Sequence, residues 1–257
     1  AGDCLHRILE RLDLQHPCDS EANRELVQAE LRRAALSHEP LEPLLAGLEL
    51  VRTTPFGGPL GRRCIADLLP QRRLHELKFD LSLGRVSAAQ LADSFRRHPG
   101  GAVGGDYARR LAALPIDSSG FLTGSIDLVF QDSGPLEQWW VVDWKSNWLG
   151  ERDDAGRPLR CGPRHYGRPQ LLALMADAHY PLQAHLYLVA LHRYLQWRLP
   201  RYAPQQHLGG YAYVFLRGCP GAIAGDTLPD FVPGQLIERP PLARILALDA
   251  ALAGEGQ

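Results

Sequence analysis

The segment from Gln138 to Lys145 constrains the fold of this chain more than any other segment does. Its residues are apolar on both faces of an extended strand, apart from Asp143 and Lys145. A strand that is apolar on both faces belongs in the interior of a sheet whose two sides are covered. The segment therefore predicts a central strand that carries an acid and a lysine at its end.

The segments around it predict further strands and helices. Apolar and polar residues alternate from His75 to Leu83 and again from Phe121 to Gln131, which predicts two half-buried strands, and Gly209–Arg217 predicts another. Helical spacing or a capping residue predicts helices over residues 5–12, 20–37, 87–97, 181–199 and 241–252. Prolines and glycines limit residues 40–70 to short elements, and residues 147–168 form a long arginine-rich loop. This order predicts an α/β fold with a small mixed central sheet flanked by helices.

Composition limits the class of protein and its surroundings. The 28 basic and 29 acidic residues give a net charge of -1, which excludes binding to nucleic acid by overall charge but allows a local basic patch. No apolar run reaches the roughly 18–20 residues of a membrane span, so we predict no membrane partner. The five cysteines form no C-x-x-C pair. This predicts reduced thiols, a cytoplasmic location, and neither a zinc nor an iron–sulfur site.

Length and the start of the chain bear on domain organisation. The 257 residues fit one large domain or two small ones. The one methionine is Met175, and a helical pattern begins within the first few residues without a lead-in. We therefore expect the chain to be a piece of a longer protein.

The tripeptide Asp143-Trp144-Lys145 is the strongest candidate for chemistry. Residues two apart in a strand project from the same face, so the acid and the lysine stand side by side. Asp127 reaches the same place if its strand and the next one form a hairpin. Two carboxylates about 4 Å apart repel by roughly 4 kcal/mol at an effective dielectric of 20, and a Mg²⁺ ion between them removes that cost. A lysine beside such a metal can polarise an attacking water. The alternative is a structural ion pair at a strand end.

Several motifs together resemble the PD-(D/E)xK nuclease superfamily, and within it the RecB-type nuclease domains. The motifs are Gly124-Ser-Ile-Asp127, Val141-Val-Asp143-Trp-Lys145-Ser-Asn147, Gln183-x-x-x-Tyr187, Leu5-His6 in the opening helix, and Tyr-x-Phe-Leu-Arg217-Gly. The similarity extends from about residue 5 to the last helix. It implies a restriction-endonuclease-like core and a single nuclease domain over residues 1–257, at the C-terminus of a larger helicase–nuclease subunit.

The resemblance also implies roles for particular residues. Its metal ligands are Asp127, Asp143, His6 and the main-chain carbonyl of Trp144, and its catalytic lysine is Lys145. Taken alone, a histidine on an amphipathic helix, as His6 is, is more often a packed or surface residue than a metal ligand.

Three further positions match the family pattern. Glu76 corresponds to an extra acidic position that touches the metal directly or through water, and the alternative is a solvated strand residue. Gln183 and Tyr187 share one helix face and line the site, and the alternative is a place in the core. Apart from the resemblance, the arginines of residues 152–168 are candidates for phosphate contacts, and Trp148 and Tyr166 for stacking on bases. The equal alternative is a solvated mobile loop.

The implied activity is Mg²⁺-dependent hydrolysis of DNA phosphodiester bonds, with single-stranded DNA delivered by a helicase during recombinational repair. Mn²⁺ or Ca²⁺ can occupy such a site, and Ca²⁺ is expected to be non-catalytic. The implied partners are DNA, RecC-type and RecD-type subunits, and RecA. The chain lacks the G-x-x-x-x-G-K-[ST] loop of a motor. Two alternatives stay open: a nuclease-like docking module that binds DNA or RecA without cleavage, and a standalone defence nuclease of the same superfamily.

Overall fold

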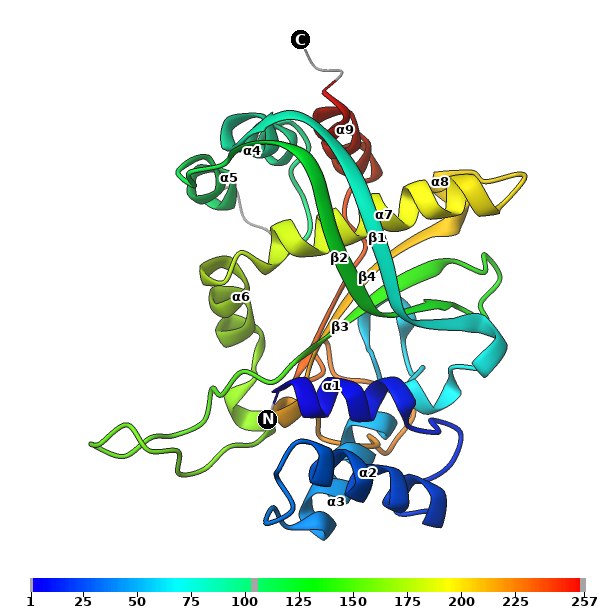
Figure 1. The fold of residues 1–257 in the computed structure, drawn as a ribbon, viewed down its shortest axis with the longest axis vertical. Coiled ribbons are helices and arrows are strands. Elements are labelled where there is room, and N and C mark those ends of the chain that lie inside the picture. Colours follow the sequence, from blue (N-terminus) through cyan, green and yellow to red (C-terminus); the bar gives the residue numbers. More distant parts are fainter. Residues whose placement is uncertain (1, 103–105, 255–257) are drawn as a thin grey trace. The chain divides into compact units, whose positions relative to one another are not determined.

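The computed structural model describes residues 2–102 and 106–254. In these ranges five strands form one sheet in the order β1-β2-β3-β4-β5 (Figure 1). The strands are β1 (Arg73–Ser87), β2 (Asp117–Gln131), β3 (Trp139–Lys145), β4 (Leu208–Phe215) and β5 (Gln235–Glu238). The helices are α1 (Gly2–Arg11), α2 (Glu21–Arg33), α3 (Leu41–Thr53), α4 (Ala88–Arg97), α5 (Asp106–Ala112), α6 (Arg168–Asp177), α7 (Tyr180–Arg198), α8 (Pro204–His207) and α9 (Leu242–Ala253).

The sheet is mixed, as the sequence predicts. A short turn joins β2 to β3, where the Asp132 amide donates to the Gln138 carbonyl at 2.7 Å, so these neighbours form a hairpin. By contrast, Gly209 near the start of β4 lies against Trp140 near the start of β3, which makes β3 and β4 parallel. The connection between them contains α6 and α7, as a parallel crossover requires. The predicted α/β class is confirmed.

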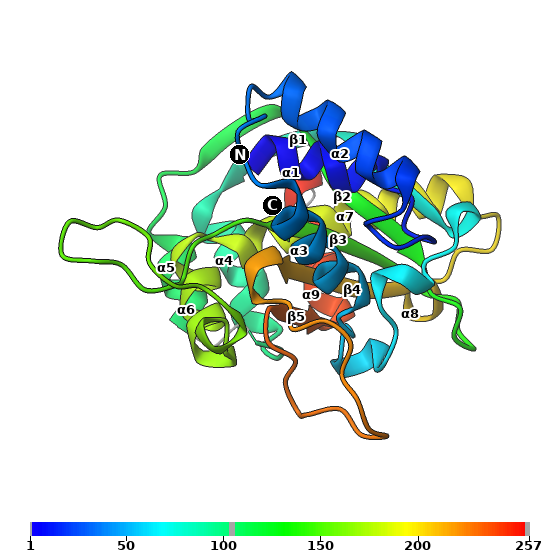
Figure 2. The ribbon, with the colours of Figure 1, turned by 90° about the horizontal axis from the view of Figure 1, so that it is seen from below.

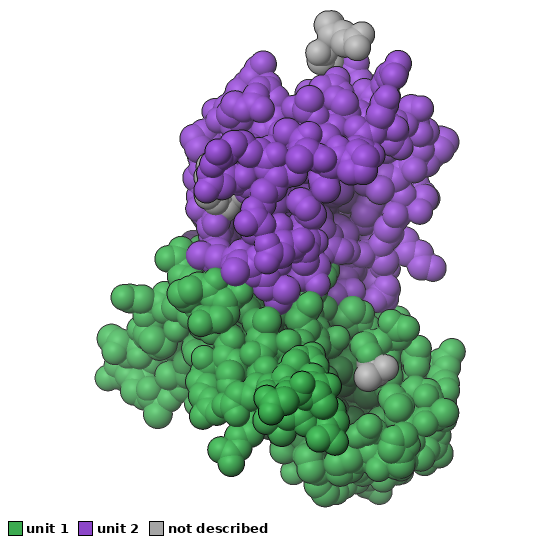
Figure 3. All heavy atoms as spheres, turned by 90° about the vertical axis from the view of Figure 1, so that its left-hand side faces the viewer, with its two compact units in different colours: residues 1–75, 142–171, 212–237 green, residues 76–141, 172–211, 238–257 purple. Residues whose placement is uncertain are grey.

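The chain divides into two compact units, each built from three segments (Figure 3). Unit 1 comprises residues 1–75, 142–171 and 212–237, and unit 2 comprises residues 76–141, 172–211 and 238–257. The predicted single domain stays a prediction. None of the helices in the described part of the chain is long and apolar enough to cross a bilayer.

Three helices of unit 1 pack through their apolar faces, and Figure 2 shows α1, α2 and α3 close together. Their buried residues include Ile8 and Leu9 of α1, Val27 of α2, and Leu45 and Leu48 of α3. The first helix forms where helical spacing predicts it. The second ends at Arg33, earlier than predicted, because the backbone soon turns left-handed, with a φ of 55° at Ala35.

Helix α3 corrects the expectation of only short elements between residues 40 and 70. Pro40 precedes the helix and Pro43 lies in its first turn, where a missing amide proton breaks no helical hydrogen bond. Beyond Thr54 the predicted short turns do occur.

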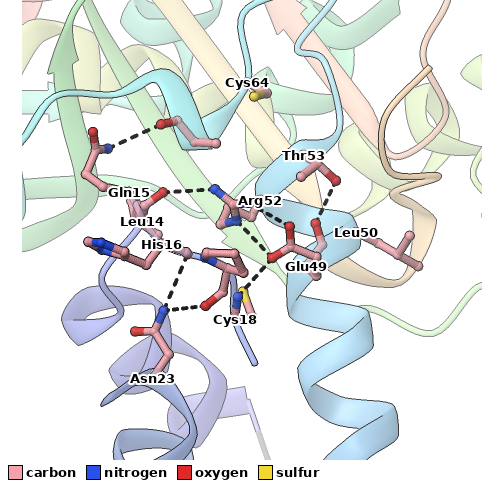
Figure 4. Close-up of polar contacts among 12 residues, drawn as sticks. Leu14, Gln15, His16, Cys18, Asn23, Glu49, Leu50, Arg52, Thr53 and Cys64 are labelled. Carbon is pink, nitrogen blue, oxygen red and sulfur yellow. Dashed lines mark hydrogen bonds and ion pairs between the residues drawn. The ribbon is translucent and has the colours of Figure 1, made fainter. Parts of the chain in front are cut away.

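Polar contacts link the end of α3 to the connection between α1 and α2 (Figure 4). Arg52 binds Glu49 through two nitrogens, at 2.9 and 2.6 Å, and also donates to the Leu14 carbonyl at 3.3 Å. Glu49 in turn accepts from the Cys18 amide at 2.9 Å. The buried Asn23 donates to the Asp13 and Pro17 carbonyls, both at 3.0 Å. These bonds satisfy backbone groups in a segment that has no regular structure of its own.

Unit 2 contains α4, α5, α7 and α9. The predicted capping box at the start of α4 is confirmed, since Gln90 and Ser87 exchange hydrogen bonds. Arg244 of α9 is buried and donates to the carbonyls of His98 and Gly100, which connects α9 to the end of α4. The strands β1 and β2 are 15 residues each and longer than predicted. The helices α5, α6 and α8 and the strand β5 were not predicted.

Candidate active site

Strand β3 brings an acid and a lysine to the same side of the sheet in unit 1. Trp140, Val141 and Val142 are buried, and the strand ends at Lys145. The Asp143 Oδ2 atom lies 2.6 Å from Lys145 Nζ, with the two side chains only 5% and 12% exposed. A charge-assisted contact this short fixes the position of the ammonium group.

Lys145 has a second contact in unit 1. Its Nζ atom lies 5.1 Å from the ring centroid of Tyr213, which belongs to the neighbouring strand β4. A cation over an aromatic face is attracted by the ring, and more so where water is scarce. The acid and the aromatic ring together restrict the lysine to a few orientations.

Helix α1 directs His6 towards the middle residue of the same tripeptide. The His6 Nε2 atom lies 2.9 Å from the Trp144 carbonyl oxygen. The helix is held in place by its buried residues Cys4, Ile8 and Leu9. Two of the four predicted metal ligands are therefore within hydrogen-bond distance of each other.

In unit 2, Glu76 has an unusual backbone conformation. Its φ is 49°, in the left-handed region that residues other than glycine rarely adopt. Its Oε2 atom accepts a hydrogen bond from the Ser125 hydroxyl of β2 at 2.7 Å. Strained backbone of this kind costs on the order of 1–3 kcal/mol and concentrates at functional sites. The conformation redirects the Glu76 side chain within an otherwise regular strand.

Gln183 and Tyr187 contact each other on α7 of unit 2, as their spacing predicts. The Gln183 amide donates to the Tyr187 hydroxyl at 3.0 Å. The Tyr187 ring packs edge-on against Phe79 of β1, with centroids 5.9 Å apart. Gly124 of β2 leaves room for the Phe79 ring, because a Cβ atom at Gly124 would lie 2.5 Å from Phe79 Cζ.

Asp127 is a half-buried residue of β2 in unit 2, whereas Asp143 and Lys145 belong to unit 1. The hairpin on which its predicted role depends is present, as the turn between β2 and β3 shows. The convergence of Asp127 with Asp143 stays a prediction.

Two residues beside the tripeptide have roles that the sequence did not reveal. Tyr166 is fully buried, so its predicted stacking on a base is wrong. Its hydroxyl donates to the Asn147 carbonyl at 2.6 Å, and burial, reinforced by a hydrogen bond with Cys161, raises the pKa of this phenol. Arg217 donates to the Ser146 carbonyl. Both residues therefore hold the backbone that follows Lys145, and the Phe-Leu-Arg217-Gly motif was the one available signal.

The donor atoms of unit 1 fit a hard divalent ion. Within residues 2–102 and 106–254, no three His, Cys, Asp or Glu side chains form a ready metal cage. Mg²⁺ does not require one, since it keeps several waters and takes one or two carboxylates. The Asp143 carboxylate and the Trp144 carbonyl, from adjacent residues of β3, provide oxygen donors, and the His6 imidazole of α1 provides a nitrogen beside that carbonyl.

Comparison with known proteins defines the class. The model of the PD-(D/E)XK nuclease superfamily matches residues 1–230, so the chain belongs to that superfamily.

Within that class, the chain is similar to RecB subunits of RecBCD enzymes. The subunit from Mycobacterium tuberculosis H37Rv is 34% identical over 271 residues, which is 98% of this chain and 23% of the relative. The subunit from Mycolicibacterium smegmatis is 33% identical, over 99% of this chain and 24% of the relative. The Escherichia coli K12 subunit is 32% identical, over 84% of this chain and 16% of the relative. The chain thus spans under a quarter of the length of these relatives.

Proposed function

We propose that this chain is a Mg²⁺-dependent deoxyribonuclease domain that hydrolyses phosphodiester bonds of single-stranded DNA in recombinational double-strand-break repair. The superfamily supports nuclease chemistry, and the similarity to RecB subunits supports DNA as the substrate. One observation carries the proposal: Lys145, Asp143, the Trp144 carbonyl and His6 are joined by two short contacts at the end of a buried strand.

The proposed mechanism assigns a task to each residue. Asp127, Asp143, His6 and the Trp144 carbonyl would hold the ion, and Glu76 would be a further acidic residue of the site. A bound divalent ion supplies charge stabilisation at the scissile phosphate and at the leaving 3′ oxygen. Lys145, fixed by Asp143 and Tyr213, donates a hydrogen bond to the attacking water and orients it. Gln183 and Tyr187 position the DNA backbone, and the products carry 5′-phosphates.

The partners follow from the relatives rather than from this chain. The relatives are named as subunits of a RecBCD enzyme. We therefore propose that the chain works with RecC-type and RecD-type subunits in the cytoplasm, that a helicase delivers its DNA, and that RecA is a further partner. Mn²⁺ is expected to replace Mg²⁺, and Ca²⁺ to bind without supporting cleavage.

The first prediction concerns Lys145. Replacing it by alanine removes the group that orients water, so cleavage of labelled single-stranded DNA in Mg²⁺ should fall by about 10²- to 10⁴-fold. Arg85→Ala is the matched control, because it also removes one positive charge, from a side chain that is 79% exposed and paired only at the surface. EDTA should abolish cleavage by the unmodified chain. Circular dichroism checks that both variants fold.

Two results would contradict the proposal. Full cleavage by Lys145→Ala would remove the lysine from the mechanism. Binding of DNA without any metal-dependent degradation by the unmodified chain would favour the docking module.

A further inference from the structure

A hollow in unit 1 is lined in part by Trp148, which follows the tripeptide segment in the chain. Its volume is about 560 Å³, and its lining includes Leu44 and Leu48 of α3, Trp148, Leu159 and Arg217. Most of this surface is apolar, yet it includes one indole ring and one guanidinium group. Packed protein cores contain few voids larger than a water molecule, whereas this hollow is large enough for a ligand. It is therefore a candidate site for a flat, largely apolar group.

Trp148 and Arg217 form a pair at this hollow. The Arg217 guanidinium carbon lies 5.8 Å from the Trp148 ring centroid, within the range of a cation–π contact. Arg217 also donates to the Ser146 carbonyl, one residue beyond Lys145. The pair is therefore fixed to the same short stretch of backbone as the candidate catalytic lysine.

A second, basic hollow continues from the first. It has a volume of about 520 Å³ and shares Leu159 and Cys161 with its neighbour, while Arg160, Arg164 and His165 give it positive charge. Glu151 pairs with Arg164 and lies 3.6 Å from His165. Arg160 is exposed and has no acidic partner in the described part of the chain, so its charge is available to an anion.

The loop that carries these basic residues is more ordered than the sequence predicts. The Glu151 amide donates to the Arg160 carbonyl at 2.7 Å, and the Leu159 amide donates back to Glu151 at 2.9 Å. Residues 151–160 thus form a paired arm, and Figures 1 and 2 show it extending outwards. The arm holds Leu159 and Arg160 at the two hollows.

We propose that the hollow at Trp148 takes one unstacked nucleobase of a DNA strand, with Arg160 contacting an adjacent phosphate. An aromatic ring with an arginine is the usual platform for a base, and an unpaired arginine complements the backbone charge. The site would hold the strand beside Lys145. This inference rests on the proposed function, because it names where the same substrate is bound.

The test measures DNA binding without cleavage. In EDTA, the 257-residue chain is titrated into fluorescein-labelled dT12 and into an abasic strand of the same length, and anisotropy gives the two dissociation constants. Trp148→Ala should weaken binding of dT12 by roughly 5- to 150-fold, as removal of one stacking aromatic does. Binding of the abasic strand should be unchanged, and Trp148→Phe should restore most of the dT12 affinity.

A second pair of variants keeps the test valid if Trp148→Ala perturbs folding. Gly47 of α3 lines the hollow, and a Cβ atom there would have nothing within 4 Å. Gly47→Leu should fill the hollow and weaken dT12 binding as Trp148→Ala does. Ala22→Leu, the matched control, adds an isobutyl side chain on the exposed face of α2, outside the hollow, and should bind dT12 normally.

Each other outcome overturns the proposal. Equal losses on dT12 and the abasic strand would mean that Trp148 does not contact a base. Unchanged binding by both Trp148→Ala and Gly47→Leu would leave the hollow to a protein partner. The binding test in EDTA does not depend on cleavage. If dT12 binds through its bases but Mg²⁺ supports no degradation, the nuclease proposal is rejected and the base-binding site is retained.

Discussion

At the scale of single residues, Asp143, Trp144 and Lys145 each offer a different group: a carboxylate, a main-chain carbonyl and an ammonium. The Asp143 and Lys145 side chains contact each other on one face of the strand. The Trp144 carbonyl between them is contacted by His6 of α1. Two-residue periodicity explains the arrangement, because it pairs the side chains at either end of the tripeptide.

Glu30 of α2 provides a prediction about stability and pH. It is buried and accepts from Arg7 of α1 at 3.0 Å and from Arg11. Burial by itself raises the pKa of Glu30, but the hydrogen bond from Arg7 and the charge of Arg11 outweigh it, so the pKa lies below 4.5. A carboxyl with a lowered folded-state pKa contributes stability above its unfolded pKa and loses it as the pH falls through the folded value.

Glu30→Gln should therefore lower the free energy of unfolding by about 2 kcal/mol at pH 7. The difference from the unmodified chain should shrink towards zero below the folded-state pKa, where Glu30 itself is protonated. Urea unfolding at several pH values measures this. Glu42→Gln is the control, because the Glu42 side chain is 70% exposed in its pair with Arg24 and should change stability little. A loss for Glu30→Gln that is the same at every pH would contradict the assignment.

Strand and helix periodicity predicted contacts between residues that are two or four positions apart. It could not predict contacts between residues that are far apart in the sequence. The pairs Asp143–Lys145 and Gln183–Tyr187 follow from strand and helix spacing. Arg217 reaches the Ser146 carbonyl across 71 positions of sequence, and no local pattern encodes that contact. Tyr166 was misassigned for the same reason, since its burial depends on residues from other segments.

At the scale of elements, a helix or strand was predicted correctly where its sequence has a clear hydrophobic period or a capping motif. The alternation in β1 and the capping box of α4 were sufficient to predict both. Strand β5 has four residues, too few for a period to be detected. Helix α3 was missed because its prolines were taken as breaks, although they stand before or within the first turn.

The packing of β2 against β1 leads to a prediction at Gly124. An added methyl group would lie 2.5 Å from the Phe79 ring, which is itself packed against Tyr187. Gly124→Ala should therefore destabilise the chain by about 1–3 kcal/mol, as overpacking does. Denaturant unfolding measures the loss.

A double variant identifies the cause. In a Phe79→Leu background the same Gly124→Ala change should cost less, because the ring that it strikes is gone. Gly47→Ala is the matched control for glycine replacement, and it should stabilise α3 by roughly 0.5–1 kcal/mol, since the added methyl group meets no atom. Equal costs of Gly124→Ala in both backgrounds would show that the Phe79 ring is not the obstacle.

At the scale of the whole molecule, the boundaries of the two compact units fall within β1, β3, α6, β4 and β5. The mixed sheet was predictable from the order of its elements, because hairpins and a helical crossover allow few alternatives. The division into units was not, since it depends on which distant segments pack together. The proposed ligands are distributed accordingly, with His6 and Asp143 in unit 1 and Asp127 in unit 2.

The last prediction concerns the effect of metal on the stability of the whole chain. An ion that binds only the folded state stabilises it by about 2.7 kcal/mol at a hundred times its dissociation constant. For a chain of this size that corresponds to a rise in Tm of roughly 5–10 °C. Ca²⁺ should produce this rise in calorimetry without cleavage, and EDTA should reverse it. Asp127→Ala and Asp143→Ala should each abolish most of the rise. Asp106→Asn, which changes a carboxylate that is 81% exposed, should keep it. If either aspartate variant gains as much stability from Ca²⁺ as the unmodified chain, that aspartate is not a metal ligand.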